Sequence, residues 1–110
     1  MRSWIFVAGA LLLASTRCEA AGAHCPAEAG LHSIEGNIST FVNFANGTGM
    51  TVRTYWINYQ GQRQFYAEVP AGQSYRQQTY VTHPWVVTDS SENCLKVYMP
   101  QPSESTVTIP

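Results

Sequence analysis

The segment MTVRTYWINYQGQRQFYAEV, residues 50–69, decides the fold class. β-Branched and aromatic residues alternate with polar ones along residues 50–59, and the turn Gln60-Gly61-Gln62 separates this run from a second one at 64–69. Such alternation is typical of strands that pack one face on a core. The first run divides into two faces, Val52, Thr54 and Trp56 on one side and Tyr55, Ile57 and Tyr59 on the other. The segment therefore predicts two strands joined by a turn.

Side-chain parity in the second run predicts which of its residues point toward the core. Successive side chains of a strand point to opposite faces of the sheet. We expect an inward face of Phe65, Ala67 and Val69, and an outward face of Tyr66 and Glu68. The hydroxyl of Tyr66 should then face solvent or a ligand.

Runs of the same kind continue on both sides of this segment. Residues 41–44, 75–81, 85–88 and 95–99 are expected to be strands, and residues 106–109 to add an edge strand. Gly, Pro, Asn and Ser separate the runs, and a sustained apolar period of 3.6 residues is absent from the sequence. Short strands at this spacing are typical of a sandwich. The sequence therefore predicts an all-β fold, a small β-sandwich of six to seven strands.

Length and charge limit the classes of function. The chain has 110 residues, enough for one domain, of which 45% are hydrophobic and 12% charged. Lys and Arg number 6 against 7 for Asp and Glu, so no basic surplus exists to neutralise phosphates, and we expect no nucleic-acid partner. The sequence contains no HExxH, GxSxG or P-loop motif. We therefore expect no enzyme, no cofactor and no metal site.

Residues 1–23 have the organisation of a secretory signal peptide. Met1-Arg2-Ser3 carries one positive charge, residues 4–14 form an uncharged apolar run, and small residues precede Ala20 and Ala23. This order predicts cleavage after Ala20 or Ala23 and a mature domain at 24–110. The apolar run is too short to cross a bilayer core of about 30 Å, so we expect a secreted, extracellular protein with no membrane span.

Loss of Cys18 with the signal peptide leaves two cysteines, Cys25 and Cys94. An even pair in an oxidising compartment predicts one disulfide. The bond would close nearly the whole domain and stabilise it by about 4 kcal/mol in the chain-entropy model. Two free thiols are the alternative, because the sequence does not show that the two Cα atoms meet.

Two N-glycosylation sequons follow the signal peptide. They are Asn37-Ile38-Ser39 and Asn46-Gly47-Thr48. We expect a bulky glycan to fit more easily on Asn46, because this sequon lies at a Gly-containing turn.

One group of side chains has the chemistry of a ligand pocket. Tyr66, Thr79, His83 and Trp85 together offer an indole face, two hydroxyls and an imidazole. An aromatic face accepts a compact ring, while hydroxyl and imidazole groups exchange hydrogen bonds with a ligand hydroxyl. In the alternative interpretation Trp85 belongs to the core and His83 is a turn residue, and the pattern by itself favours this alternative.

Leu31 to Asp89 resembles, without a gap, the β-domain of the von Hippel–Lindau tumour-suppressor family. A W-(I/L)-N-(Y/F)-x-G run followed by P-x-G and then H-x-W is specific in combination. The matching segments are Leu31-His32-Ser33, Phe44-Ala45-Asn46, Trp56-Ile57-Asn58-Tyr59-Gln60-Gly61, Val69-Pro70-Ala71-Gly72, and Thr79-Tyr80 with His83-Pro84-Trp85. The resemblance implies a small sandwich that recognises 4-hydroxyproline in an extended peptide laid along a sheet edge.

Positions in the resembling segment imply individual roles. Trp56 and Trp85 would line the pocket for the ring, and Tyr66 would bond the carbonyl of the hydroxyproline. Thr79, which stands where the family has Ser, and His83 would bond the hydroxyproline oxygen. Proline leaves both groups unpaired, at a cost of roughly 1–3 kcal/mol each, and this difference would be the source of selectivity.

Departures from the family pattern affect the peptide flanks and the partners. Gln78 stands where the family has a His that touches peptide backbone, and Glu35 and Asn37 differ from the family at flanking positions. The implied partner is a hydroxyproline-containing or proline-rich extracellular protein, whose polyproline II conformation enters an aromatic groove at little ordering cost. We expect no elongin complex and no ubiquitin-ligase role, because no helical α-domain follows. The alternative function is a secreted structural or adhesive β-sandwich module without hydroxyproline binding.

Overall fold

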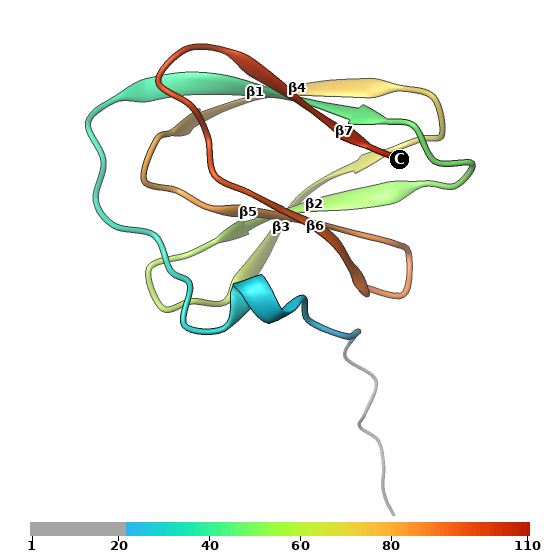
Figure 1. The fold of residues 1–110 in the computed structure, drawn as a ribbon, viewed down its shortest axis with the longest axis horizontal. Coiled ribbons are helices and arrows are strands. Elements are labelled where there is room, and N and C mark those ends of the chain that lie inside the picture. Colours follow the sequence, from blue (N-terminus) through green and yellow to red (C-terminus); the bar gives the residue numbers. More distant parts are fainter. Residues whose placement is uncertain (1–21) are drawn as a thin grey trace, which may run out of the picture.

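The computed structural model describes residues 22–110, so the predicted signal peptide lies almost wholly outside the described residues. The described part is built of strands and one 3₁₀ helix, and it confirms the all-β prediction (Figure 1). The elements are η3 (Pro26–Glu28), β1 (Ser39–Asn46), β2 (Val52–Ile57), β3 (Arg63–Val69), β4 (Ser74–Tyr80), β5 (Trp85–Thr88), β6 (Cys94–Tyr98) and β7 (Ser105–Ile109). The strand expected at 85–88 coincides with β5, and the edge strand expected near the C-terminus is β7.

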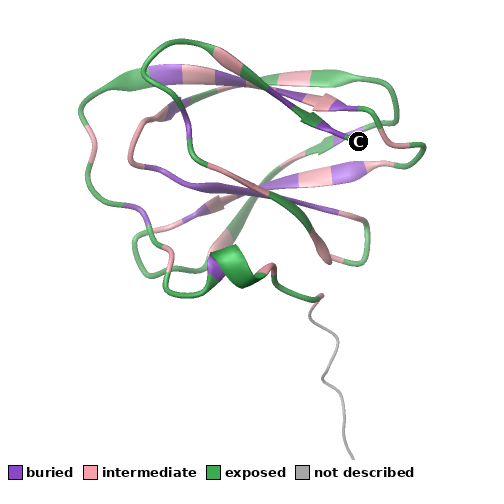
Figure 2. Cartoon of the chain, in the orientation of Figure 1, coloured by how far each residue is buried: buried purple, intermediate pink, exposed green. Residues whose placement is uncertain are grey.

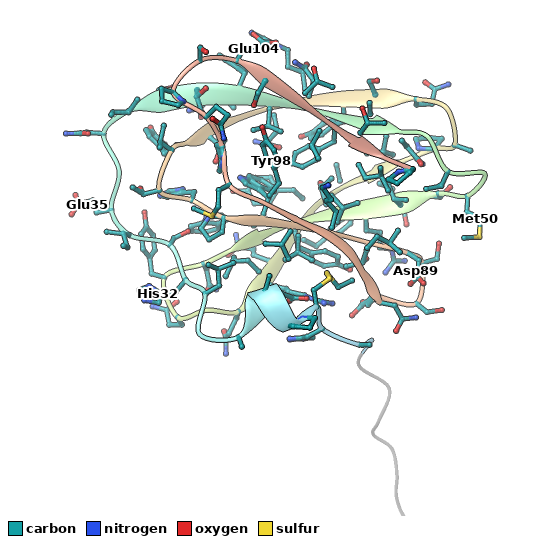
Figure 3. The ribbon with its side chains drawn as sticks, in the orientation of Figure 1. His32, Glu35, Met50, Asp89, Tyr98 and Glu104 are labelled. Carbon is teal, nitrogen blue, oxygen red and sulfur yellow. A yellow bond between two sulfur atoms is a disulfide. The ribbon has the colours of Figure 1, made fainter. Side chains whose placement is uncertain are left out.

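The strands form two sheets that face each other as the layers of a sandwich (Figure 1). One sheet has the order β4-β1-β7 and the other the order β3-β2-β5-β6. All pairs are antiparallel except β1 and β7, which run parallel. Tyr98 of β6, labelled in Figure 3, joins the two sheets on one side, where its hydroxyl donates to Ser105 Oγ of β7 at 2.7 Å. The opposite side carries the edge strands β3 and β4.

The core fills the space between the two sheets, and buried positions alternate along β1 as its period of two predicts (Figure 2). A fully buried side chain of this kind contributes about 1.5–3 kcal/mol through the hydrophobic effect. The main cluster consists of Val42, Phe44, Val52, Val69, Trp85, Val87, Val107 and Ile109. A second cluster of Tyr55, Ile57 and Val86 lies on the outer face of the four-stranded sheet. Both predicted faces of β2 are therefore buried.

β2 is shorter than the predicted strand at 50–59, and Tyr59 does not share a face with Tyr55. The strand ends at Ile57 because the Asn58 side chain turns the backbone, its Oδ1 accepting from the N–H groups of Gln60 and Gln62 at 3.0 and 2.9 Å. Gly61 completes this turn with φ of 78°, a left-handed conformation that glycine adopts without strain. The turn sends Tyr59 toward the rim of the sandwich.

A β-bulge in β3 makes the predicted parity of residues 64–69 wrong at Phe65. Thr54 of β2 pairs with Ala67 and Tyr55 pairs with Phe65, so Tyr66 is an extra residue with no partner of its own. An inserted residue reverses which face the following side chains occupy. Phe65 therefore lies on the outer face, 52% exposed, with its ring centroid 5.7 Å from that of Tyr55.

The predicted disulfide is present. It joins Cys25 to Cys94, whose Cα atoms are 5.3 Å apart although they are separated by 69 residues in the sequence (Figure 3). Beside it, the buried Glu28 carboxylate accepts from Arg63 Nη2 at 2.9 Å and from the Cys25 N–H at 2.8 Å. Burial by itself would raise the pKa of Glu28, but these hydrogen bonds and the Arg63 charge lower it below the ordinary value. The bridge and the ion pair fix η3 under the four-stranded sheet.

The folded domain includes Ala23, whose backbone is hydrogen-bonded to three other residues. The Ala23 N–H donates to Asn93 Oδ1 at 2.8 Å, and its carbonyl accepts from the Cys94 N–H at 2.8 Å and from Arg63 Nη2 at 3.3 Å. Among residues 22–110, none of the helical segments has the length and apolar character needed to cross a bilayer.

Candidate functional site

A cavity of about 130 Å³ opens where the two sheets carry their edge strands. It is much smaller than the sites of drug-sized ligands, which start at roughly 300 Å³, and it suits one compact ring. All six residues that the sequence singled out for the site line it together with Tyr80. The lining residues are Trp56 from β2, Tyr66 from β3, Gln78, Thr79 and Tyr80 from β4, His83 from the following turn, and Trp85 from β5.

Aromatic rings form the walls of this cavity. The Tyr66 ring stands nearly perpendicular to both indoles, with centroids 5.0 Å from Trp85 and 6.5 Å from Trp56. The His83 ring lies 5.3 Å from Trp56 at an interplanar angle of 32°. The bulge in β3 explains why Tyr66 can face both indoles. Tyr66 is the extra residue of this bulge, and the local bend of the strand directs its side chain over the edge of the sandwich. Such walls favour an apolar ring placed between them.

Trp56 presents an apolar face to the cavity because its polar atom is already bonded. Its indole N–H donates to Ser33 Oγ at 2.7 Å, and the Ser33 hydroxyl donates to the Ile57 carbonyl at 2.5 Å. Ser33 is itself buried, with its N–H bonded to the Asn58 carbonyl. This chain of bonds fixes the indole plane of Trp56.

Trp85 belongs to the core and also lines the cavity. It is 2% exposed and packs on Phe44 with ring centroids 5.6 Å apart. Its indole N–H donates to Thr79 Oγ1 at 2.9 Å. Thr79 is 3% exposed, and after accepting this bond its hydroxyl still has a hydrogen to donate.

His83 is likewise both a turn residue and a cavity residue. Its N–H closes a turn onto the Tyr80 carbonyl at 3.0 Å, and its ring is held at Nε2 by the Tyr59 hydroxyl at 3.2 Å. Nδ1 has no hydrogen-bond partner among residues 22–110. Burial lowers the pKa of His83 below its ordinary value, which keeps the imidazole neutral at pH 7.

Gln78 and Tyr66 supply polar groups at the rim. The Gln78 amide nitrogen donates to Ser39 Oγ at 2.9 Å and to the Thr79 carbonyl at 2.7 Å, which leaves its Oε1 as an acceptor for a ligand N–H. Tyr66 is 43% exposed, and its hydroxyl makes no hydrogen bond to other residues in 22–110. Both positions can therefore bond a peptide backbone.

The free edge of β4 runs past the cavity. Val81 donates to the Ile38 carbonyl and Asn46 donates to the Gln73 carbonyl, so odd-numbered residues of this strand direct their backbone groups toward β1. In an antiparallel ladder the alternate residues direct theirs away. The outward backbone groups belong to Ser74, Arg76, Gln78 and Tyr80. The Gln78 carbonyl accepts from the Gln77 side chain and the Tyr80 carbonyl accepts from the His83 N–H, so at these two residues the N–H is the group left for an added chain. An exposed row of this kind can pair with an added extended chain.

Comparison with known proteins agrees with this geometry. The family model described as the VHL beta domain matches residues 31–101, which include every residue that lines the cavity. The chain belongs to the VHL beta-domain family. No curated protein sequence matches the chain significantly. A VHL beta domain is a protein-binding module that recognises substrates and is not a catalytic domain.

The segment matched by the VHL beta-domain family includes the whole cavity. Three residues that hold the cavity rings in place, Ser33, Tyr59 and Tyr80, were not predicted from the sequence as site residues. Ser33 and Tyr59 lie inside the segments that resemble the family, yet spacing cannot show that Ser33 bonds Trp56 or that Tyr59 bonds His83. Tyr80 precedes the turn, and its ring centroid lies 5.2 Å from that of His83. The bonds of Ser33 and Tyr59 join residues 23 and 24 positions apart in the sequence, so only the fold reveals them.

The two sequons of this VHL beta domain differ in exposure, in the reverse of the expected order. Asn46 is 3% exposed, and its amide nitrogen donates to the carbonyls of Met50 and Val69 at 2.7 and 2.8 Å. Its Oδ1 accepts from the N–H and the hydroxyl of Thr48, so this Asn-Gly-Thr triplet is a structural turn. Asn37 is exposed, as is Glu35, which points away from the sandwich (Figure 3). The turn-based expectation that a glycan fits better on Asn46 is therefore wrong.

Proposed function

We propose that this VHL beta domain binds extended peptides that contain 4-hydroxyproline and that it takes the hydroxylated ring into the cavity. The observation that supports the proposal is the combination of aromatic walls with two buried polar groups, Thr79 and His83. A pyrrolidine ring fits the apolar walls, and its hydroxyl provides a partner for both polar groups. Proline leaves both unpaired, at roughly 1–3 kcal/mol for each group.

The free edge of β4 supports an extended binding mode for the rest of the peptide. The outward N–H of Gln78 and the outward backbone groups of Arg76 are in position to pair with an added chain, and the Gln78 Oε1 and the Tyr66 hydroxyl flank the cavity. Main-chain bonds at this edge contribute affinity that does not depend on hydroxylation. The cavity then contributes the selectivity.

Calorimetric titration with two matched peptides tests the proposal. The peptides differ only by the ring hydroxyl, and we expect the hydroxyproline peptide to bind at least roughly tenfold more tightly, as two hydrogen bonds in a buried site provide. His83→Ala should remove most of this difference. Phe65→Ala is the matched control for Tyr66→Ala, because the two residues are adjacent in β3 but lie on opposite faces.

The competing function is a structural or adhesive module that uses another surface. Equal affinity for the two peptides, or binding of neither by a folded domain, would support this alternative and contradict hydroxyproline recognition. A domain that only adheres to proline-rich chains would lose affinity in Trp56→Ala, because this change removes an apolar wall. It would show no selective loss in His83→Ala.

We further propose that the protein is secreted and begins at Ala21 after signal-peptide cleavage. The backbone of Ala23 is hydrogen-bonded to Asn93 and Cys94 in the folded domain. Cleavage after Ala23 would remove this residue and both bonds, whereas cleavage after Ala20 keeps them, so the contacts support cleavage after Ala20. The disulfide is consistent with an oxidising compartment. N-terminal sequencing of protein from the medium of expressing cells tests this, and a mature N-terminus at His24 would contradict it.

In the secretory pathway we expect one N-glycan, on Asn37. The amide nitrogen of Asn46 uses its hydrogens in two backbone bonds and is buried, whereas Asn37 is exposed. Enzymatic removal of N-glycans converts the modified Asn to Asp, which peptide mass spectrometry locates. Asn37→Gln should abolish the glycan, and a glycan found on Asn46 would contradict the expectation.

A further inference from the structure

The polar groups of the cavity have a fixed direction of hydrogen bonding. The indole N–H of Trp85 is only a donor, so Thr79 Oγ1 must accept at the 2.9 Å contact between them. The hydroxyl hydrogen of Thr79 is then free to donate. A ligand hydroxyl next to Thr79 therefore receives a hydrogen and must give its own hydrogen to an acceptor.

His83 is the group that can accept this hydrogen. Its ring lines the cavity and is neutral, and a neutral imidazole has one donor nitrogen and one acceptor nitrogen. Nε2 is occupied by the Tyr59 hydroxyl at 3.2 Å, so Nδ1 is the nitrogen left for a ligand. Acceptance at Nδ1 requires that the ring proton sit on Nε2.

We propose that Tyr59 is a positioning residue which accepts the Nε2–H of His83 and so keeps Nδ1 unprotonated as the acceptor for a ligand hydroxyl. The proposal rests on the proposed function and adds a residue that touches neither the cavity nor the ligand. The bonds then run in one direction, from the Trp85 N–H through Thr79, the ligand hydroxyl and His83 to the Tyr59 oxygen. Each group between the two ends accepts one hydrogen bond and donates one, and a ligand hydroxyl can do both.

Tyr59 also holds the rings, and one substitution separates the two roles. Its ring meets Trp56 edge-on at 5.4 Å and His83 edge-on at 5.5 Å. Tyr59→Phe keeps both ring contacts and removes only the hydroxyl. Tyr98→Phe is the control, because it removes a tyrosine hydroxyl that bonds Ser105 Oγ on the opposite side of the sandwich, and Tyr98 does not line the cavity.

Two measurements on the secreted protein test the proposal. Imidazole ¹⁵N chemical shifts of the free protein report which nitrogen of His83 carries the proton, and we expect Nε2–H in the wild type and a mixture in Tyr59→Phe. Titration with the matched peptides should show about tenfold weaker binding of the hydroxyproline peptide by Tyr59→Phe, with affinity for the proline peptide unchanged. Tyr98→Phe should match the wild type in both measurements.

Several results would overturn the proposal. These are an Nδ1–H tautomer in the wild type, an equal loss of affinity for both peptides in Tyr59→Phe, or no change in that variant. A wild type that binds the two peptides equally would instead remove the proposed function. The chemical shifts of the free protein would then still decide whether Tyr59 sets the protonation of His83.

Discussion

The single variant Thr79→Val is expected to lower both the stability of the fold and the preference of the site for hydroxyproline. The two side chains have nearly the same shape, so the change removes the hydroxyl and little else. Thr79 is 3% exposed and Trp85 is 2% exposed, so the bond between them is buried. The Trp85 N–H, now bonded to Thr79 at 2.9 Å, is left without a partner.

The expected magnitude follows from this unpaired donor. A buried polar group that loses its partner costs about 1–3 kcal/mol of folding free energy. For a domain of this size each kcal/mol lowers the melting temperature by about 4–8 °C. The same change removes one of the two bonds to a ligand hydroxyl, so the preference for hydroxyproline over proline should fall roughly tenfold.

Urea denaturation followed by tryptophan fluorescence measures the first effect, and calorimetric titration with the matched peptides measures the second. Thr79→Ser is the control, because it retains the hydroxyl and should keep both the Trp85 bond and the peptide preference. The titration is done well below the lowered melting temperature, so that the variant is folded. A Val variant with wild-type stability and wild-type peptide preference would refute the reasoning for both effects.

Three further predictions concern the frame of the domain. Reducing the Cys25–Cys94 bond should lower the unfolding free energy by about 4 kcal/mol, measured by melting with and without reductant, and an unchanged melt would contradict this. The pKa of Glu28 is lowered in the folded state. Its pairing with Arg63 therefore stabilises the fold at pH values above the ordinary pKa of 4.5, and this stabilisation is lost as the pH falls through the folded-state pKa. Glu28→Gln should therefore be less stable at neutral pH and lose less stability on acidification, whereas an equally steep acid dependence would refute this assignment. Asn46→Ala should cost about 1–3 kcal/mol in urea denaturation, because it removes the amide donor to the buried Val69 carbonyl and one of two donors to the Met50 carbonyl, and a neutral effect would show that the turn does not need the amide.

Alternation and turn residues determined the fold class and most strand positions. The faces of β2 followed from a period of two, and Gly61 marked the turn that follows it. The predicted strand at 50–59 ran past its true end, because the Asn58 side chain already turns the backbone. These signals are local, since side-chain parity and turn conformation depend on a few neighbouring residues. The pairing of Cys25 with Cys94 was also predictable, because a pair of cysteines has one possible partner each.

The site residues were predictable for a different reason. Composition offered Tyr66, Thr79, His83 and Trp85 as a pocket, but the pattern alone favoured a core tryptophan and a turn histidine. The family resemblance ordered these residues, and the fold then placed them around one cavity. Trp85 packs on the core and also lines the cavity, since an edge position lets a residue do one with each face, and its contact with a ligand stays a prediction.

Only the tertiary structure decided the features that depend on contact across the chain. The bulge at Tyr66 is a shift in the pairing of β2 with β3, so it could not be predicted from the sequence of β3 alone. Asn46 and Asn37 carry the same motif, yet Asn46 is buried and bonded to the carbonyls of Met50 and Val69, whereas Asn37 is exposed. The sequence thus determined what each segment does alone, through backbone preference and side-chain period. The fold decided which distant polar atoms meet, because hydrogen bonds between side chains depend on positions in space.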